Sequence, residues 1–157
     1  MTTVGWDEFA TEAPELAAAV RARFEAARHH VLATLRADGS PRVSGTEVDF
    51  HDGDLALGSM YGAVKARDLR RDGRFALHAN PGDGSMAGGD AKVAGVAEEV
   101  TGEDLARYSD DGNPPGSFHL FRLRLGEVVL TSVHPDGDRL VIETWRPGEG
   151  VVRRERA

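Results

Sequence analysis

The chain has 157 residues, of which 40% are hydrophobic and 29% are charged, and this composition fits one globular domain over residues 1–157. It contains no cysteine, which excludes thiolate nucleophiles, iron–sulfur clusters and cysteine zinc sites. The net charge of −7 opposes binding to nucleic acids and anionic membranes, so we expect neither as a partner. No segment approaches the roughly 20 apolar residues of a membrane span and the first residues lack a signal-peptide pattern, so we expect a cytoplasmic protein.

The first half of the chain predicts a helix followed by strands. Leu16, Val20 and Phe24 recur on one helical face, which predicts a helix over residues 14–28. Strands are predicted at residues 29–36, 42–50 and 55–59, with Asp-Gly turns between them, so these three form a meander. A second helix is predicted over residues 62–71.

The second half predicts further strands and little helix. Strands are expected at residues 74–79, 91–100, 118–133 and 139–145, with a short helix opening at Thr101 or Gly102. The glycine-rich loop 80–90 is expected near the binding pocket, and the arginine-rich tail 151–157 has no apolar period of its own. About seven antiparallel strands with short helices packed outside predict a mainly β barrel of the α+β class.

Motifs of the common enzyme classes are absent. The chain has no Walker loop, no G-x-S-x-G elbow and no H-E-x-x-H motif. Its six histidines stand without metal-ligand spacing, so no metal site is predicted. The sequence therefore assigns no catalytic residue.

The segment 55–69 (LALGSMYGAVKARDL) predicts a strand, a turn and a helix whose first turn carries Lys65. A helix N-terminus has unpaired N–H groups and a partial positive charge, so this lysine and the hydroxyl of Ser59 could hold a phosphate. Lys65 and Lys92 are the two lysines among 19 basic residues, the others being arginine. The alternative is a solvated Lys65, with Ser59 or Gly62 only capping the helix.

Four segments together resemble the pyridoxamine 5′-phosphate oxidase-like split-barrel family. They are VLATLRADGSPRVSGTEVDF, DLALGSM, GAVKARDLRRDGRFALHA and AKVAGVAEEV, and the resemblance is best over residues 20–100. It implies a split β-barrel of about six to seven strands, a homodimer and two cofactor sites shared between the chains. The expected cofactor is FMN, with the deazaflavin coenzyme F-420 as the alternative.

The resemblance also implies which residues bind the cofactor. The phosphate-binding lysine of the family corresponds to Lys65, and the hydroxyl residue that ends the preceding strand corresponds to Ser59, with Met60 beside it. The strand that runs along the flavin ring corresponds to Ser44, Gly45 and Thr46, followed by Glu47. A glycine inside a strand fits the close approach of a ligand, although a bulge explains Gly45 equally well.

Two departures from the family pattern limit what the resemblance implies. The oxidases have an arginine before the lysine, where this chain has Val64, so part of the phosphate contact is expected from elsewhere, such as Lys92. The C-terminal pattern that binds the vitamin phosphate is also missing. The leading hypothesis is therefore a flavin- or deazaflavin-dependent oxidoreductase that transfers hydride to or from an unidentified small molecule. The alternatives are a non-enzymatic flavin- or tetrapyrrole-binding protein and a structural dimer.

Overall fold

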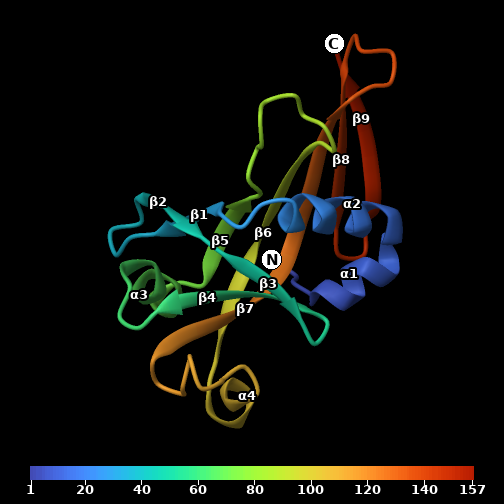
Figure 1. The fold of residues 1–157 in the computed structure, drawn as a ribbon. Helices are drawn as coiled ribbons and strands as arrows, with labels where there is room; N and C mark the ends of the chain where they lie inside the picture. Colours follow the sequence, from blue (N-terminus) through green and yellow to red (C-terminus); the bar gives the residue numbers. More distant parts are fainter.

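One antiparallel sheet of nine strands forms the body of the protein, and four short helices lie against it in a computed structural model that describes residues 1–157 (Figure 1). The helices are α1 (Trp6–Glu12), α2 (Pro14–Glu25), α3 (Val64–Arg71) and α4 (Gly102–Ala106). The strands are β1 (His30–Leu35), β2 (Pro41–Thr46), β3 (Val48–His51), β4 (Asp54–Met60), β5 (Arg74–His78), β6 (Asp90–Val100), β7 (Phe118–Val133), β8 (Leu140–Arg146) and β9 (Gly150–Arg156). None of the helices is long and apolar enough to cross a membrane.

The sheet divides at its longest strand, β7. The strand order is β2-β1-β5-β6-β7-β4-β3, and β8 and β9 continue from the other part of β7. Residues 118–122 of β7 pair with β4, whereas residues 128–133 pair with β8. β6 pairs with β7 along both parts. This division gives the split-barrel-like α+β fold that the sequence predicts.

The predicted meander is wrong, because the strand expected at residues 42–50 is two strands. It breaks at Glu47, and its halves β2 and β3 lie at opposite ends of the strand order. β1 pairs with β2 and β5, while β3 and β4 join the sheet through β7. Since a single residue links β2 to β3, the two ends of the strand order must meet at Glu47, which curls the sheet into a barrel.

Two further segments differ from the sequence predictions. The tail forms strand β9, which pairs with all of β8 from Leu140 to Arg146. Its side chains are exposed throughout, so the apolar periodicity that reveals a buried strand is missing from it. Helix α1 was not predicted because only Trp6 and Phe9 mark its buried face.

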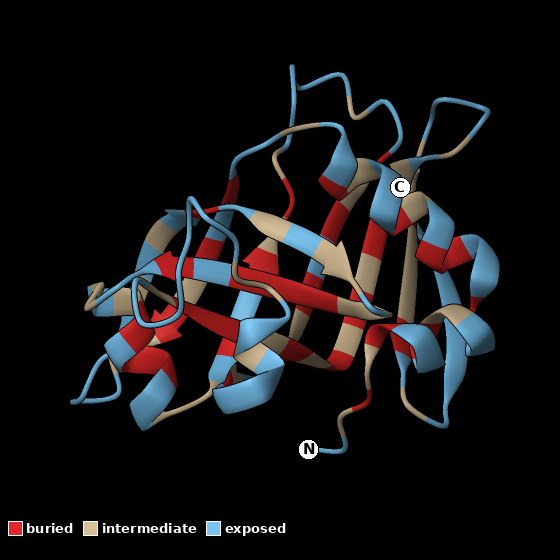
Figure 2. Ribbon diagram, turned by 60° about the horizontal axis from the view of Figure 1, so that its bottom comes forward, coloured by how far each residue is buried: buried red, intermediate tan, exposed pale blue.

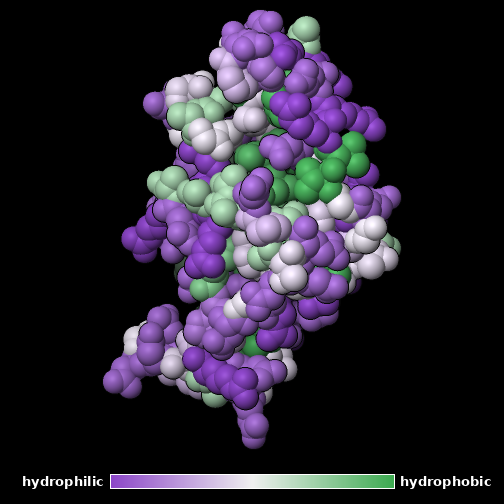
Figure 3. Space-filling view, turned by 90° about the vertical axis from the view of Figure 1, so that its right-hand side faces the viewer, coloured by the Kyte–Doolittle hydropathy of each residue, from purple (hydrophilic) through white to green (hydrophobic).

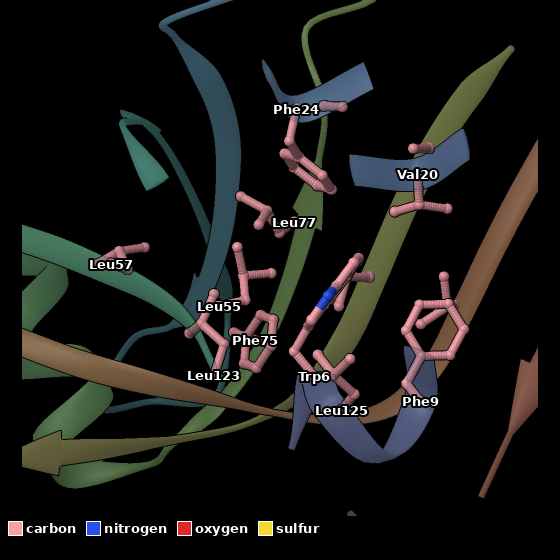
Figure 4. Packing of buried hydrophobic residues seen from close by; sticks show 14 of the residues in the cluster. Trp6, Phe9, Val20, Phe24, Leu55, Leu57, Phe75, Leu77, Leu123 and Leu125 are labelled. Atoms are coloured by element: carbon pink, nitrogen blue, oxygen red, sulfur yellow. The ribbon is translucent and has the colours of Figure 1, made fainter. Parts of the chain in front are cut away.

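Helices α1 and α2 close one end of the barrel with large apolar side chains. Trp6 and Phe9 of α1 and Val20 and Phe24 of α2 point toward the sheet (Figure 4). They meet strand residues that are also buried, among them Leu55, Phe75, Leu77, Leu123 and Leu125. In Figure 2 both helices are red on the side facing the strands and blue on the side facing solvent. The core therefore lies between these helices and the inner face of the sheet.

Strands β8 and β9 form the edge of the sheet beyond β7, and the side chains of β9 are exposed to solvent. Figure 3 views the side of the molecule that bears α1, α2, β8 and β9, and it is largely hydrophilic with a patch of hydrophobic atoms in its upper half. The indole Nε1 of Trp145 in β8 donates to Oε2 of Glu12 (3.0 Å), and its ring lies 4.7 Å from that of Phe9. Trp145 is fully buried and so anchors the β8–β9 hairpin to α1 at the end next to its turn.

Candidate functional site

A groove of about 790 Å³ lies on the outer side of the barrel, where β2, β3 and β4 meet. The start of β7 and the segment after α4 form one wall, and α3 reaches the groove through Lys65. The lining residues from β2 to β4 and α3 are Gly45, Thr46, Glu47, Val48, Asp49, Ala56, Gly58, Ser59, Met60 and Lys65. Those outside these elements are His29, Tyr108, Asn113, Ser117, Phe118 and Leu120.

The alternation of side chains along β4 produces the apolar floor of the groove. Leu55 and Leu57 point into the core and are fully buried, so Ala56, Gly58 and Met60 face outward. On β7, Leu120 lies opposite Gly58 and Phe118 lies opposite Met60. A Cβ added at Gly58 would meet no atom within 4 Å, so the glycine leaves space above the floor.

Lys65 stands in the first turn of α3, as the sequence predicts. Its Nζ donates to the carbonyl oxygen of Gly45 in β2 (2.8 Å). Burial lowers the pKa of Lys65 by disfavouring the charged form, and the nearby carboxylate of Glu47 opposes this in part. No side chain caps the N-terminus of α3, where Ala63 is the capping residue. The groove therefore has a cation beside an uncapped helix start.

Helix α3 is fixed to the sheet by a buried carboxylate. Asp68 is 2% exposed, and its oxygens accept hydrogen bonds from Thr34 Oγ1 (2.8 Å), Arg42 Nε (2.7 Å) and Arg71 Nη2 (2.8 Å). Arg71 also donates to the carbonyl oxygen of Leu35 (2.8 Å). These bonds join α3 to β1 and β2. Sequence reasoning missed them because the donors lie up to 34 residues away from Asp68.

Acidic groups line the side of the groove next to Lys65. The carboxylate of Glu47 accepts from Arg28 Nε (2.9 Å), and Nε2 of His29 lies 3.4 Å from the same oxygen. Asp49 is the second acidic residue on this side. The groove therefore combines one cationic end with an acidic and apolar remainder.

The structure brings five of the seven predicted binding residues together and separates two. Gly45, Thr46, Ser59, Met60 and Lys65 line the groove. Ser44 does not, because it lies opposite the buried Leu32 and its Oγ is enclosed without a hydrogen-bond partner. Lys92 lines a different hollow on the outer face of β6, beside His78 and Val129. Within one chain, Lys92 therefore does not supply the second phosphate contact expected of it.

The glycine-rich loop also lies away from the groove. The guanidinium of Arg23 in α2 donates to the carbonyl oxygens of Ala87 (2.8 Å) and Asn80 (3.5 Å), and no residue of the loop lines the groove. Within one chain, the loop therefore does not border the groove. The loop is held by a helix that the sequence does not place next to it.

One group of side chains has the spacing of metal ligands, at the β7–β8 turn. His134, Asp136 and Asp138 place one ligand atom each within 4.8 Å of one another. The guanidinium of Arg139 already lies among them, 2.6 Å from Asp138 and 3.4 Å from Asp136. The arginine compensates the acidic charges, so this group is a surface ion-pair network.

Comparison with known proteins places the chain in a family. The family model described as pyridoxamine 5′-phosphate oxidase matches residues 16–132. PhzG from Burkholderia lata, solved with tetrahydrophenazine-1-carboxylic acid, has a TM-score of 0.67 at 14% identity, covering 96% of this chain and 92% of that chain. A pyridoxamine 5′-phosphate oxidase-related, FMN-binding protein from Nostoc punctiforme has a TM-score of 0.66 at 12% identity, covering 92% and 96%.

A third similar structure has a different ligand in its name. HutZ, the heme storage protein of Vibrio cholerae, has a TM-score of 0.58 at 18% identity and covers 76% of this chain and 94% of its own. No curated protein matches the sequence. At these identities the solved structures establish the fold, whereas the family match spans most of the chain. The chain belongs to the pyridoxamine 5′-phosphate oxidase-like family.

Proposed function

We propose that this protein binds FMN in the groove, with the flavin phosphate at Lys65, and acts as a redox protein on a small molecule. The position of Lys65 carries the proposal. Lys65 is the only lysine or arginine that lines the groove, and it lies in the first turn of a helix that has no side-chain cap. An anion is stabilised at such a helix start by free N–H groups and the helix dipole. The similar FMN-binding protein from Nostoc punctiforme supports the choice of ligand.

The residues present fit a flavin phosphate. Lys65 and the α3 N-terminus would hold the phosphate, and the apolar floor formed by Phe118 and Leu120 suits an aromatic ring system. A Cβ added at Gly45 or Gly58 would meet no atom within 4 Å, so both glycines keep the groove open to a flat ligand. These features support the FMN site that the family resemblance implies.

A bound flavin would supply the hydride-transfer chemistry, and the chain would supply binding and orientation. No side chain in the groove needs a catalytic role for this, in line with the lack of a catalytic motif. Glu47 is paired with Arg28, whereas Asp49 is the acidic residue of the groove without such a partner, so a redox partner that is neutral or cationic near Asp49 is expected. Coenzyme F-420 is the alternative cofactor.

A second candidate function is tetrapyrrole binding in the same groove. The side chain of His29 is 73% exposed and Met60 is 82% exposed, and both line the groove. Imidazole and thioether groups are axial ligands of haem iron, so either residue could bind a haem. The likeness to HutZ gives this candidate a structural precedent.

We further propose that two copies of the chain pair through the outer face of β1, β2, β5 and β6. Val43 is 69% exposed and Val31 is 42% exposed, and Ala33 and Ala76 lie beside them in the strand register. Val31, Ala33 and Ala76 border a hollow of about 260 Å³ that is mostly apolar. An apolar sheet face of this kind is stabilised when a second chain covers it.

The absorbance spectrum of the purified protein, with mass spectrometry of any released ligand, chooses among these cofactors. A flavin band supports the proposal, a deazaflavin band supports coenzyme F-420, and a Soret band supports a tetrapyrrole. If added haem gives a shifted Soret band, loss of that shift in His29→Ala or in Met60→Ala identifies the axial ligand. A protein that binds none of the three would contradict every candidate.

Titration of FMN and riboflavin tests the role of Lys65. A charge-assisted contact contributes about 1.5–3 kcal/mol, so Lys65→Ala should weaken FMN binding by about 10- to 150-fold. Riboflavin, which lacks the phosphate, should bind with nearly unchanged affinity. Lys65→Arg keeps the cation and should retain most of the FMN affinity.

Arg154→Ala is the matched control, because Arg154 is an exposed cation of β9 that lines neither the groove nor the proposed dimer face. It should leave FMN binding unchanged. A loss in Lys92→Ala with none in Lys65→Ala would place the phosphate at Lys92 instead. An equal loss of FMN and riboflavin in Lys65→Ala would mean that the substitution disturbs the fold, and no loss for either would remove Lys65 from the site.

A further inference from the structure

The turn that leads from β4 into α3 is held by a histidine from another strand. The backbone N–H of Gly62 donates to Nε2 of His119 in β7 (3.0 Å), although the two residues are 57 positions apart. Gly62 has a φ of +75°, in the left-handed region that favours glycine, and the N–H of Ala63 bonds to the carbonyl oxygen of Met60 (3.1 Å). This turn sets where the first residues of α3 begin.

The surroundings of His119 fix the imidazole in one orientation. The residue is 8% exposed, and the ring of Tyr61 stacks on it with centroids 4.9 Å apart and an interplanar angle of 15°. Its Nδ1 lies 3.4 Å from a carboxylate oxygen of Glu99 in β6, and the other oxygen of Glu99 lies 2.9 Å from Nε of Arg70 in α3. The carboxylate favours the proton on Nδ1, which leaves Nε2 free to accept from Gly62.

We propose that His119 is a positioning residue for the phosphate site. It does not line the groove, so it acts through Gly62. Its Nε2 holds the turn, the turn sets the start of α3, and α3 presents Lys65. Glu99 links the same imidazole to Arg70 in the last turn of α3. This inference rests on the proposed function, because the turn matters for binding only if the phosphate lies at Lys65.

Two substitutions of His119 separate the effect of its hydrogen-bond acceptor, Nε2, from the effect of its ring. His119→Phe keeps a ring that can stack on Tyr61 but has no acceptor for Gly62. In His119→Gln, an amide oxygen at a similar reach can accept the Gly62 N–H. The first readout is hydrogen exchange of the Gly62 amide in the protein without ligand. We expect slow exchange in the wild type and in His119→Gln, and faster exchange in His119→Phe.

The second readout is binding of FMN and riboflavin to the same three proteins. Loss of one neutral hydrogen bond that orders the site should weaken FMN binding by about three- to tenfold in His119→Phe. Riboflavin affinity should stay unchanged, and His119→Gln should recover most of the FMN affinity. If the Phe variant does not fold, as judged by thermal unfolding, His119→Leu takes its place.

The outcomes separate this inference from the proposed function. Unchanged Gly62 exchange or unchanged FMN affinity in His119→Phe would overturn the role of His119, and so would an equal loss in His119→Gln. If the wild type binds FMN no more tightly than riboflavin, the proposed phosphate site itself fails and the positioning role fails with it. In that case the Gly62 exchange rates still decide whether His119 holds the turn.

Discussion

The buried carboxylate of Asp68 holds α3 against β1 and β2 through its hydrogen bonds. Burial acts to raise the pKa of Asp68, but hydrogen bonds from Arg42, Arg71 and Thr34 together outweigh it and lower the pKa below the usual range. A carboxylate with a depressed pKa in the folded state stabilises the fold above its unfolded-state pKa of about 3.9. That stabilisation is lost as the pH falls through the folded-state pKa.

Asp68→Asn should therefore destabilise the protein by about 1–3 kcal/mol at pH 7, because two arginines lose their charged partner. The difference between the variant and the wild type should shrink as the pH falls below about 4, where Asp68 of the unfolded chain takes up its proton, and should vanish only below the lower folded-state pKa. Urea unfolding of both proteins between pH 3 and pH 7 measures this. Asp104→Asn removes the exposed partner of Arg107 and should have a much smaller effect. A difference that stays constant down to pH 3 would contradict the argument.

Among the elements, β6 and β7 meet at a bulge that depends on a glycine. Ala94 pairs with Glu127 and Gly95 with Leu125, so β7 has one extra residue, Gly126, which marks a β-bulge in β7 opposite Ala94 and Gly95. A Cβ at Gly95 would collide with the carbonyl oxygen of Arg124. The bulge strengthens the local twist at the point where the sheet divides, so β7 can pair with β4 at one end and with β8 at the other.

Gly95→Ala should destabilise the protein by about 2 kcal/mol or more, because the backbone of β7 has to move to accommodate the new methyl group. Gly58→Ala in β4 is the control, since its Cβ would meet no atom within 4 Å and the change should stay within about 0.5 kcal/mol. Thermal unfolding of both variants tests the contrast. Equal stability of the two would show that the close approach at Gly95 is easily relieved.

At the scale of the whole molecule, the exposed apolar face of β1 and β2 predicts the assembly state. Sedimentation of the native protein at micromolar concentration should give the mass of two chains, because pairing removes Val31 and Val43 from water. Val43→Asp should shift the mass toward one chain by placing a charge on that face. Ala18→Glu, on the solvent side of α2, should leave the dimer intact. A wild type that sediments as one chain would contradict the dimer and any site shared between copies.

The sequence by itself determined the features that depend on local pattern. Strand-forming residues between turn signals predicted most of the strands, and the change to a helical pattern after β4, with a glycine stop at Gly73, placed Lys65 in the first turn of α3. The order of four segments was enough to predict the family. Five of the seven predicted binding residues line one groove because they lie on two neighbouring strands and the helix that follows.

Only the tertiary structure decided the features that depend on distant residues or on solvent-facing surfaces. The break at Glu47 leaves no local mark, because both halves have strand-forming residues and only the closing of the barrel separates them. Strand β9 is exposed on both faces, so burial imposes no periodicity on its sequence. Within one chain, Lys92 lies outside the groove because β6 presents it on another face. His119 lies next to the turn before α3 because β7 pairs with β4. Contacts across such sequence separations follow from strand order, which local residue patterns do not encode.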